Sequence, residues 1–382
     1  MSDKLAMHGL TFDDVLLIPG YSDFSRADIT LETKLTKRIT LTLPLIASPM
    51  DTVTEHRLAI ELAKLGGIGI IHRNLTVAGQ ADEVAAVKKE NLLVGAAVGT
   101  NAGYEERVKA LVDAGVDLIV LDSAHGYTNT MMDALKHVKA TFTSVDIMAG
   151  NIATFAAAEA FVKAGADSLR IGMGPGAICT TRIVSGMGIP QITAIMESAR
   201  ATVGTDVSVV ADGGIKYSGD MLKALAAGAS AAMMGSYFAS SEESPGEVRE
   251  LHANEIPSRF KSIVDVNDPE KRYKFKSYRG MGSVGAMQQG AKIKSEDEYH
   301  GKSYKDRVLV AEGVEGLVPV KGTVKNLVDQ AVGGMKSGMY YVGVKTVDQL
   351  HTEAKFIQIT QASLTESHPH DILVTNPGEN YQ

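Results

Sequence analysis

The loop around the only cysteine of the chain holds the residues best suited to covalent chemistry. Cys179 lies in the segment Gly172-Met-Gly-Pro-Gly-Ala-Ile-Cys-Thr-Thr-Arg182. The three glycines before it allow tight or left-handed turns that bring a ligand close to the backbone. A thiolate there could attack an electrophile, with the hydroxyls of Thr180 and Thr181 and the guanidinium of Arg182 beside it. A free cysteine is also commonly a small buried hydrophobe, so the loop alone leaves both interpretations open.

Two later glycine-containing turns are suited to bind a phosphate. The segments Asp212-Gly-Gly-Ile215 and Gly235-Ser236 each follow a short apolar run. Backbone N–H groups at such turns and at helix starts bind anions, although glycines can also serve helix packing alone. Because the Asp212 carboxylate cannot bind an anion, we expect it to accept hydrogen bonds from hydroxyls such as those of a ribose.

Eight short apolar runs must position these residues, and each is followed by a turn and an amphipathic stretch. Runs without polar alternation are typical of parallel strands buried on both faces, and eight such units predict an α/β fold, the (β/α)8 or TIM barrel. The runs are residues 44–50, 67–72, 92–98, 117–122, 146–151, 168–173, 207–212 and 231–236. Barrel active sites are built at the carboxyl ends of the strands. The polar residues that we expect there are Ser48, Asp51, His72, Asp122, Ser123, Asn151, Arg170, Asp212, Gly235 and Ser236.

The other segments flank the expected barrel within a single catalytic domain, residues 1–382. Residues 1–43 are predicted to plug or flank the barrel, and residues 240–322 to form a long irregular flap or lid after the eighth strand. Residues 323–382 are predicted to hold helices and a polar tail. Stretches 105–114 and 218–227 have helical spacing, and Gly115 and Gly228 fall where helix C-caps belong.

Composition narrows the class of protein. The chain is 45% hydrophobic and 22% charged, with a dispersed net charge of −7, which predicts a globular protein without a basic face for nucleic acid. No apolar run approaches the ~20 residues of a membrane span, and the N-terminus shows no export signal. A lone cysteine can form neither an intramolecular disulfide nor a zinc cage, and it fits a reducing cytoplasm.

Six motifs resemble the IMP dehydrogenase / GMP reductase family, and together they cover nearly the whole chain. They are Leu10-Thr-Phe-Asp-Asp-Val-Leu-Leu-Ile-Pro19, Ser48-Pro-Met-Asp-Thr-Val53, Gly174-Pro-Gly-Ala-Ile-Cys-Thr-Thr-Arg182, Ala211-Asp-Gly-Gly-Ile-Lys-Tyr-Ser-Gly-Asp220, Tyr278-Arg-Gly-Met-Gly-Ser283 and Glu366-Ser-His-Pro-His-Asp371. Family dehydrogenases usually carry a pair of CBS domains after the second barrel helix. Here Val87-Lys-Lys-Glu-Asn-Leu-Leu-Val94 joins helix to strand directly, so we expect the pair to be absent.

The resemblance implies a reaction at C2 of a purine nucleoside monophosphate. Cys179 would attack C2 of the hypoxanthine of IMP as hydride leaves for NAD, and hydrolysis would release XMP in guanine nucleotide biosynthesis. Thr181 would position the hydrolytic water, and Glu312 and Tyr299 would also be catalytic. The substrate residues that the resemblance implies are Ser48, Met50, Asp212, Gly214, Gly235, Ser236, Tyr278, Met281, Gly282 and Glu312.

The same resemblance implies a dinucleotide site, a potassium site and an oligomer. Asp122, Ser123, Asn151 and Arg170 match positions near the dinucleotide. The potassium ion would lie on the carbonyls of Gly174, Gly176 and Cys179. The tail of a neighbouring subunit, with Glu366, Ser367 and His368, would complete its coordination, which implies a homotetramer.

Two departures keep an alternative open. Ala177 stands where the family commonly has a phosphate-binding serine, and Asp297-Glu-Tyr299 has Glu298 where dehydrogenases carry arginine. GMP reductases share the cysteine, threonine and glutamate but lack the Arg-Tyr pair, and they release ammonia from GMP with NADPH as hydride donor. Thr181 and Glu312 would be their proton path. We favour the dehydrogenase, with the reductase second and a catalytically weak nucleotide-binding paralogue third.

Overall fold

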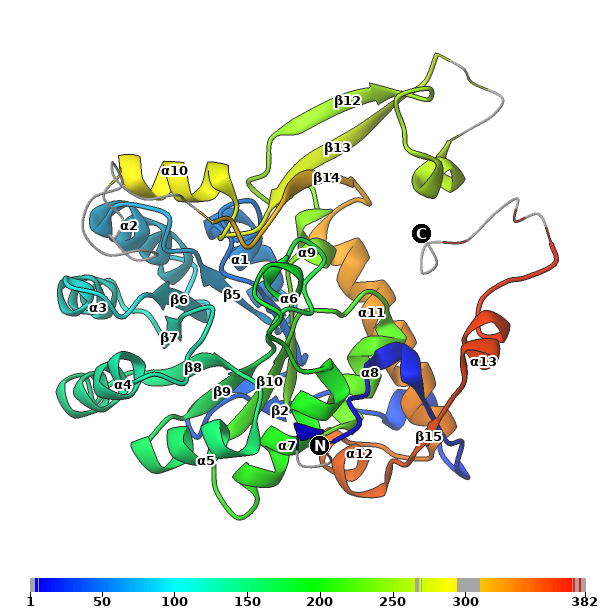
Figure 1. Ribbon diagram of the computed structural model, residues 1–382, viewed down its shortest axis with the longest axis horizontal. Coiled ribbons are helices and arrows are strands. Elements are labelled where there is room, and N and C mark those ends of the chain that lie inside the picture. The colour runs from blue at the N-terminus through cyan, green and yellow to red at the C-terminus, as the bar shows by residue number, and fades with distance from the viewer. Residues whose placement is uncertain are drawn as a thin grey trace.

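A closed barrel of eight parallel strands forms the centre of the computed structural model (Figure 1). The structure describes residues 4–372 apart from 6, 265–267, 269 and 294–309, and also describes residues 374 and 378. Each barrel strand coincides with one of the eight apolar runs, and only β8 extends past its run, by one residue, so the predicted TIM barrel is confirmed. The strands are β4 (Leu45–Ala47), β5 (Ile68–Ile71), β6 (Val94–Val98), β7 (Leu118–Asp122), β8 (Asp146–Ile152), β9 (Ser168–Ile171), β10 (Ser208–Asp212) and β11 (Ala231–Met234).

Helices on the outside of the barrel connect successive strands. They are α1 (His56–Lys64), α2 (Val77–Lys88), α3 (Tyr104–Asp113), α4 (Asn129–Thr141), α5 (Phe155–Ala164), α7 (Gln191–Thr202) and α8 (Ser218–Ala226). Gly115 and Gly228 follow α3 and α8 with φ of +89° and +110°, the left-handed backbone that glycine adopts without strain. Both predicted helix ends are confirmed. Helix α2 passes to β6 through a short turn, as the direct connection at residues 87–94 predicts.

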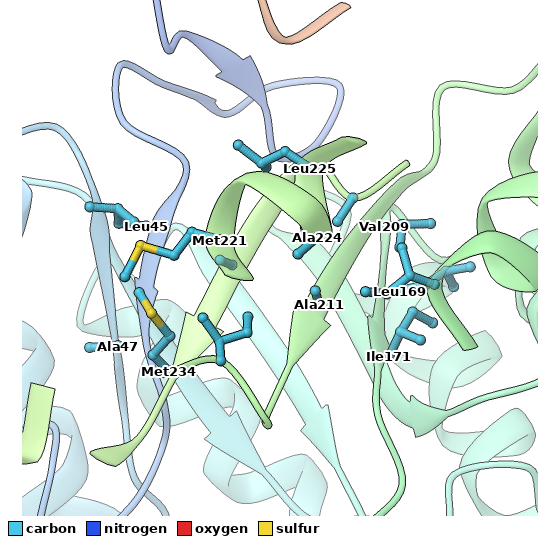
Figure 2. Packing of buried hydrophobic residues seen from close by; sticks show 14 of the residues in the cluster. Leu45, Ala47, Leu169, Ile171, Val209, Ala211, Met221, Ala224, Leu225 and Met234 are labelled. Carbon is cyan, nitrogen blue, oxygen red and sulfur yellow. The ribbon is translucent and has the colours of Figure 1, made fainter. Parts of the chain in front are cut away.

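Two layers of buried apolar side chains hold the barrel together. One layer lies inside the barrel and includes Ile46, Val120 and Met233, all fully buried. The other lies between the strands and the helices, and Figure 2 shows side chains of α8 among those of β4, β9, β10 and β11. Strands buried on both faces explain why the eight runs lack polar alternation.

The N-terminal segment closes the bottom of the barrel with a small hairpin. Strands β2 (Thr33–Lys34) and β3 (Thr40–Leu41) pair antiparallel, and Leu35 and Ile39 between them join the inner layer. The Arg38 Nε donates to Asp146 Oδ1 at 2.6 Å, at the start of β8. The short helices η2 (Phe12–Asp14) and η3 (Arg26–Asp28) precede this hairpin. Strand β1 (Val15–Leu17) pairs antiparallel with β15 (Phe356–Gln358), which ties the two ends of the chain together.

Residues 240–322 contain more regular structure than we predicted. After α9 (Ser236–Ala239), strands β12 (Val248–His252), β13 (Arg272–Arg279) and β14 (Glu315–Pro319) form an antiparallel sheet, and β12 and β13 project from the barrel (Figure 1). Helices η4 (Ser258–Ile263) and α10 (Val284–Lys292) complete the described part. The expectation of an irregular flap was therefore wrong there. Tyr273 and Phe275 alternate with lysines and are buried beside Ile256, a period of two that the many charges obscured.

Three helices follow the sheet: α11 (Val324–Val342), α12 (Val347–Glu353) and α13 (Gln361–Glu366). These helices lie in the segment predicted to hold them, and α11 extends to Val342 because Met339 continues its buried stripe. It packs on α8 and α1. Among the described residues, no helix is long and apolar enough to cross a membrane.

Candidate active site

The cysteine loop follows β9 and adopts a conformation that its glycines require. Gly172 and Gly174 have φ of +152° and +79°. A Cβ on Gly172 would lie 2.1 Å from the Asp212 carbonyl oxygen, so the loop presses against the end of β10. Arg182 holds the far side, because its Nη2 donates to the Ile189 carbonyl at 2.7 Å. The guanidinium therefore supports the loop instead of facing the thiol.

The half-buried Cys179 begins a short chain of polar groups. Its Sγ lies 3.3 Å from Thr181 Oγ1, and Thr181 Oγ1 donates to Glu312 Oε2 at 2.8 Å. Backbone bonds fix this arrangement: Thr180 N donates to Glu312 O at 3.1 Å, and Val314 N donates to Ile178 O at 2.9 Å. The short helix α6 (Thr181–Val184) begins at the threonine. The three side chains can pass a proton from the region of the thiol to a carboxylate.

Two glycine turns lie at the ends of β10 and β11. Gly213 and Gly214 have φ of +91° and +77°, and Gly235 precedes α9. A Cβ on Gly235 would lie 2.6 Å from Tyr278 Oη and 2.9 Å from Met50 Sδ, so a larger residue there would have to displace these two side chains. The backbone N–H of Ser236 hydrogen-bonds the Tyr278 phenol, and burial raises the pKa of that phenol. Tyr278 therefore stays neutral, and its O–H remains a donor.

Four of the predicted polar residues form one buried network. The Arg170 Nη1 donates to Asp122 Oδ1 at 2.5 Å, and its Nε donates to Asp212 Oδ2 at 2.9 Å. The Asn151 Nδ2 donates to Asp212 Oδ2 at 2.8 Å. Burial alone would raise the pKa of Asp122, but the charges of Arg170 and Arg73 outweigh it and lower that pKa. The Asp122 carboxylate is thus held charged, and hydrogen bonds from Arg170 and Asn151 fix the orientation of the Asp212 carboxylate at the neighbouring strand end.

Two ion-pair partners at these strand ends were missed by the sequence analysis. The Arg73 Nε donates to Asp122 Oδ2 at 3.2 Å, and Arg73 directly follows His72, which we did place there. Its position after a strand was a usable signal. Arg279, inside the Tyr278 motif, binds Asp51. The sequence placed Asp51 at a strand end but could not show its partner, 228 residues away.

Replacing Arg170 with methionine should destabilise the fold strongly. The Arg170 side chain is 9% exposed and is a shared partner of Asp122 and Asp212. Without the Arg170 guanidinium, two nearly buried carboxylates lose a positively charged partner. Breaking a buried ion pair lowers the free energy of unfolding by about 3–5 kcal/mol. Urea unfolding of Arg170→Met measures this cost. Lys163→Met is the control, because Lys163 is 70% exposed in its pair with Glu159 and should change stability by less than about 1 kcal/mol. Equal midpoints for the two variants would contradict the stabilising role of the network.

A pocket of about 360 Å³ opens beside the thiol relay. Thr181 and Glu312 form part of its wall, together with Ala124 and His125 from the loop after β7, and Gly282. Ser123 lies at the start of the same loop and donates from Oγ to the His125 carbonyl at 3.2 Å. The relay and the loop that begins at the expected dinucleotide residue Ser123 therefore border a common space.

Some predicted residues are not brought to this site. Glu366 ends α13, and Ser367 and His368 follow it, whereas α13 packs on η2 and lies apart from α6 in Figure 1. Of the carbonyls predicted to bind potassium, that of Gly176 accepts a hydrogen bond from the Cys179 N–H at 3.0 Å. Tyr299, Glu298 and the flap motif around them lie outside the described residues. The remaining substrate candidates lie on two loops: Ser48 and Met50 after β4, and Met281 and Gly282 after β13.

A closed (β/α)8 barrel that carries a cysteine and a proton relay at the carboxyl ends of its strands defines this protein as a TIM-barrel enzyme. The family model described as IMP dehydrogenase / GMP reductase domain matches residues 9–263 and 266–370. The chain therefore belongs to the IMP dehydrogenase / GMP reductase family, as its motifs predicted.

Curated relatives match over their full lengths. An inosine-5'-monophosphate dehydrogenase of Cryptosporidium parvum is 41% identical over 424 residues, covering 100% of both chains. Those of Aquifex aeolicus and Escherichia coli (strain K12) are 37% and 35% identical over 507 and 506 residues, covering 99% of each chain. Because this chain has 382 residues, these two relatives contain segments that it lacks.

Proposed function

We propose that this protein is an IMP dehydrogenase that converts IMP, NAD and water to XMP and NADH in guanine nucleotide biosynthesis. The relay from Cys179 through Thr181 to Glu312 carries the proposal, because this chemistry needs a nucleophile and a proton path at one carbon. Full-length relatives at 35–41% identity that bear this name support it.

The thiolate of Cys179 adds to C2 of the hypoxanthine, which makes that carbon a hydride donor. NAD, when bound, supplies the hydride acceptor. Water held by Thr181 then attacks C2, its proton passes through Thr181 Oγ1 toward Glu312 Oε2, and the C–S bond breaks to return the thiolate and release XMP. The same carbon thus gains a sulfur bond and loses it within one turnover.

The phosphate of the substrate would lie on the turns of Gly214 and Gly235, with the Ser236 and Tyr278 hydroxyls as further donors. Asp212 would accept the ribose hydroxyls. Ser48, Met50, Met281, Gly282 and Glu312 would surround the base. The dinucleotide would enter the pocket beside Thr181, whose wall includes Ala124 and His125. Asp122 and Ser123 directly precede those two residues, and Asn151 and Arg170 lie at the neighbouring strand ends, so these four residues would hold it from that side.

We extend the proposal to a potassium ion and an oligomer. The carbonyls of Gly174, Gly176 and Cys179 would hold the ion, since carbonyl oxygens suit a hard monovalent cation. In one chain α13 lies apart from this loop, so a neighbouring subunit would have to supply Glu366, Ser367 and His368. A homotetramer, a cytoplasmic location and one catalytic domain over residues 1–382 belong to the same proposal.

A paired substrate assay tests the function. Purified protein with IMP and NAD should form NADH, seen as rising near-ultraviolet absorbance, and potassium should increase the rate. The reverse pattern, with no NADH from IMP but consumption of NADPH with GMP, would replace the dehydrogenase by the reductase.

GMP reductase remains the second candidate because Glu298 stands where the family resemblance places an arginine in dehydrogenases. The hydrogen bond of 2.8 Å between Thr181 and Glu312 would serve either reaction. Activity in neither assay, with nucleotide binding retained, would favour the weakly active paralogue.

A further inference from the structure

Two loops that carry expected substrate residues are joined by a buried ion pair. The loop after β4 holds Met50, the end of strand β13 holds Tyr278, and the loop after β13 holds Met281. Asp51 follows Met50 and Arg279 follows Tyr278, and the two side chains form an ion pair between these segments. The Asp51 side chain is 2% exposed and that of Arg279 is 21% exposed, so the pair is largely shielded from water.

The pair has the two-pronged geometry that restricts orientation most strongly. The Arg279 Nη2 donates to Asp51 Oδ2 at 2.6 Å, and its Nε lies 3.1 Å from Oδ1 and 3.2 Å from Oδ2. The backbone N of Arg279 also donates to Thr52 Oγ1 at 3.2 Å. Planar fork contacts fix angle as well as distance, which a lysine ammonium does not do.

Helix α10 extends the same connection. The Arg279 Nη2 also donates to Gln289 Oε1 at 2.6 Å, and Asn74 Nδ2 donates both to Asp51 Oδ2 at 2.8 Å and to the Ala286 carbonyl at 3.2 Å. The two loops and this helix are thus joined through one carboxylate and one guanidinium. Because an unpaired buried carboxylate is costly, the loops cannot separate without a large penalty.

The spacing of the loops is set where the substrate candidates lie. Tyr278 Oη is 4.0 Å from Met50 Sδ, and Gly282 O accepts the Glu312 N–H at 3.1 Å. We propose that Asp51 and Arg279 are a positioning pair that fixes the gap between the two loops and so determines how tightly the purine base is held. The inference rests on the proposed function, because it takes the base to lie between these loops.

The direct test is equilibrium binding of IMP, and of GMP in parallel, by titration calorimetry without dinucleotide. Arg279→Lys keeps the charge but loses the fork, and we expect it to weaken nucleotide binding about 10-fold or more. The control Arg249→Lys alters an exposed pair with Glu247 on the same sheet and should bind as the wild type does.

A double-mutant cycle separates positioning from general stability. Asp51→Asn, Arg279→Gln and their combination should weaken nucleotide binding by similar factors, because either single change breaks the same contact. If the double variant loses nucleotide affinity by the product of the two single-variant factors, Asp51 and Arg279 act independently and the proposed positioning pair is wrong. The proposal is also wrong if folded Asp51→Asn or Arg279→Lys melts at a lower temperature but binds the nucleotide as tightly as the wild type. Weaker binding in protein that never forms NADH would refute the dehydrogenase and leave the positioning pair standing.

Discussion

Replacing Cys179 with alanine should lower turnover by about 10⁴-fold or more, because the side chain contributes the sulfur that bonds to the purine. No other cysteine exists in the chain to substitute for it. Binding of IMP should stay within a few-fold of the wild type, since the phosphate turns and the Asp212 network are built by other elements. NADH formation and titration calorimetry measure the two quantities separately.

Cys179→Ser is the matched control for the size of the side chain. It retains a hydroxyl at nearly the same place but is a far weaker nucleophile, so it should be almost as inactive as the alanine variant. Mass spectrometry of wild-type protein quenched during turnover should place a purine adduct on Cys179. Catalysis by Cys179→Ala, or an adduct on another residue, would show that the nucleophile lies elsewhere.

The barrel was predictable because its signals are local. Each strand is a short apolar run such as residues 117–122, and a strand buried on both faces needs no information from distant residues. The glycine loop before Cys179 was equally visible, since its left-handed turns require glycine at Gly172 and Gly174. The antiparallel sheet was missed because only one face of β13 carries the aromatic pair, within a stretch dominated by charge.

The contacts within the site were not predictable in the same way. Thr181 and Glu312 are 131 residues apart, and only the closed barrel and β14 bring their oxygens together. The family resemblance implied that the two residues form a proton path, but the sequence did not show which elements bring them together. The ion pair of Asp51 and Arg279 was even less predictable, because a contact between two distant residues changes the residue pattern of neither segment.

Glu312→Gln should separate the two halves of the reaction. The relay is needed when water attacks C2, and removing its carboxylate takes away the proton acceptor at the end of the 2.8 Å bond from Thr181. We expect steady-state turnover to fall by about 10²–10³-fold, because one positioned general base contributes on this order. The addition of Cys179 and the loss of hydride do not use this carboxylate, so rapid mixing should still show an initial burst of NADH, with about one NADH per active site.

The shape of the time course tests this assignment more sharply than the rate does. Thr181→Ala should give the same burst, and the double variant should be little slower than either single one, because both changes interrupt one path. Glu247→Gln, at an exposed carboxylate paired with Arg249, should leave burst and steady state unchanged. If Glu312→Gln instead slows the burst as much as the steady state, the carboxylate acts before hydride leaves, and another group must accept the proton from water.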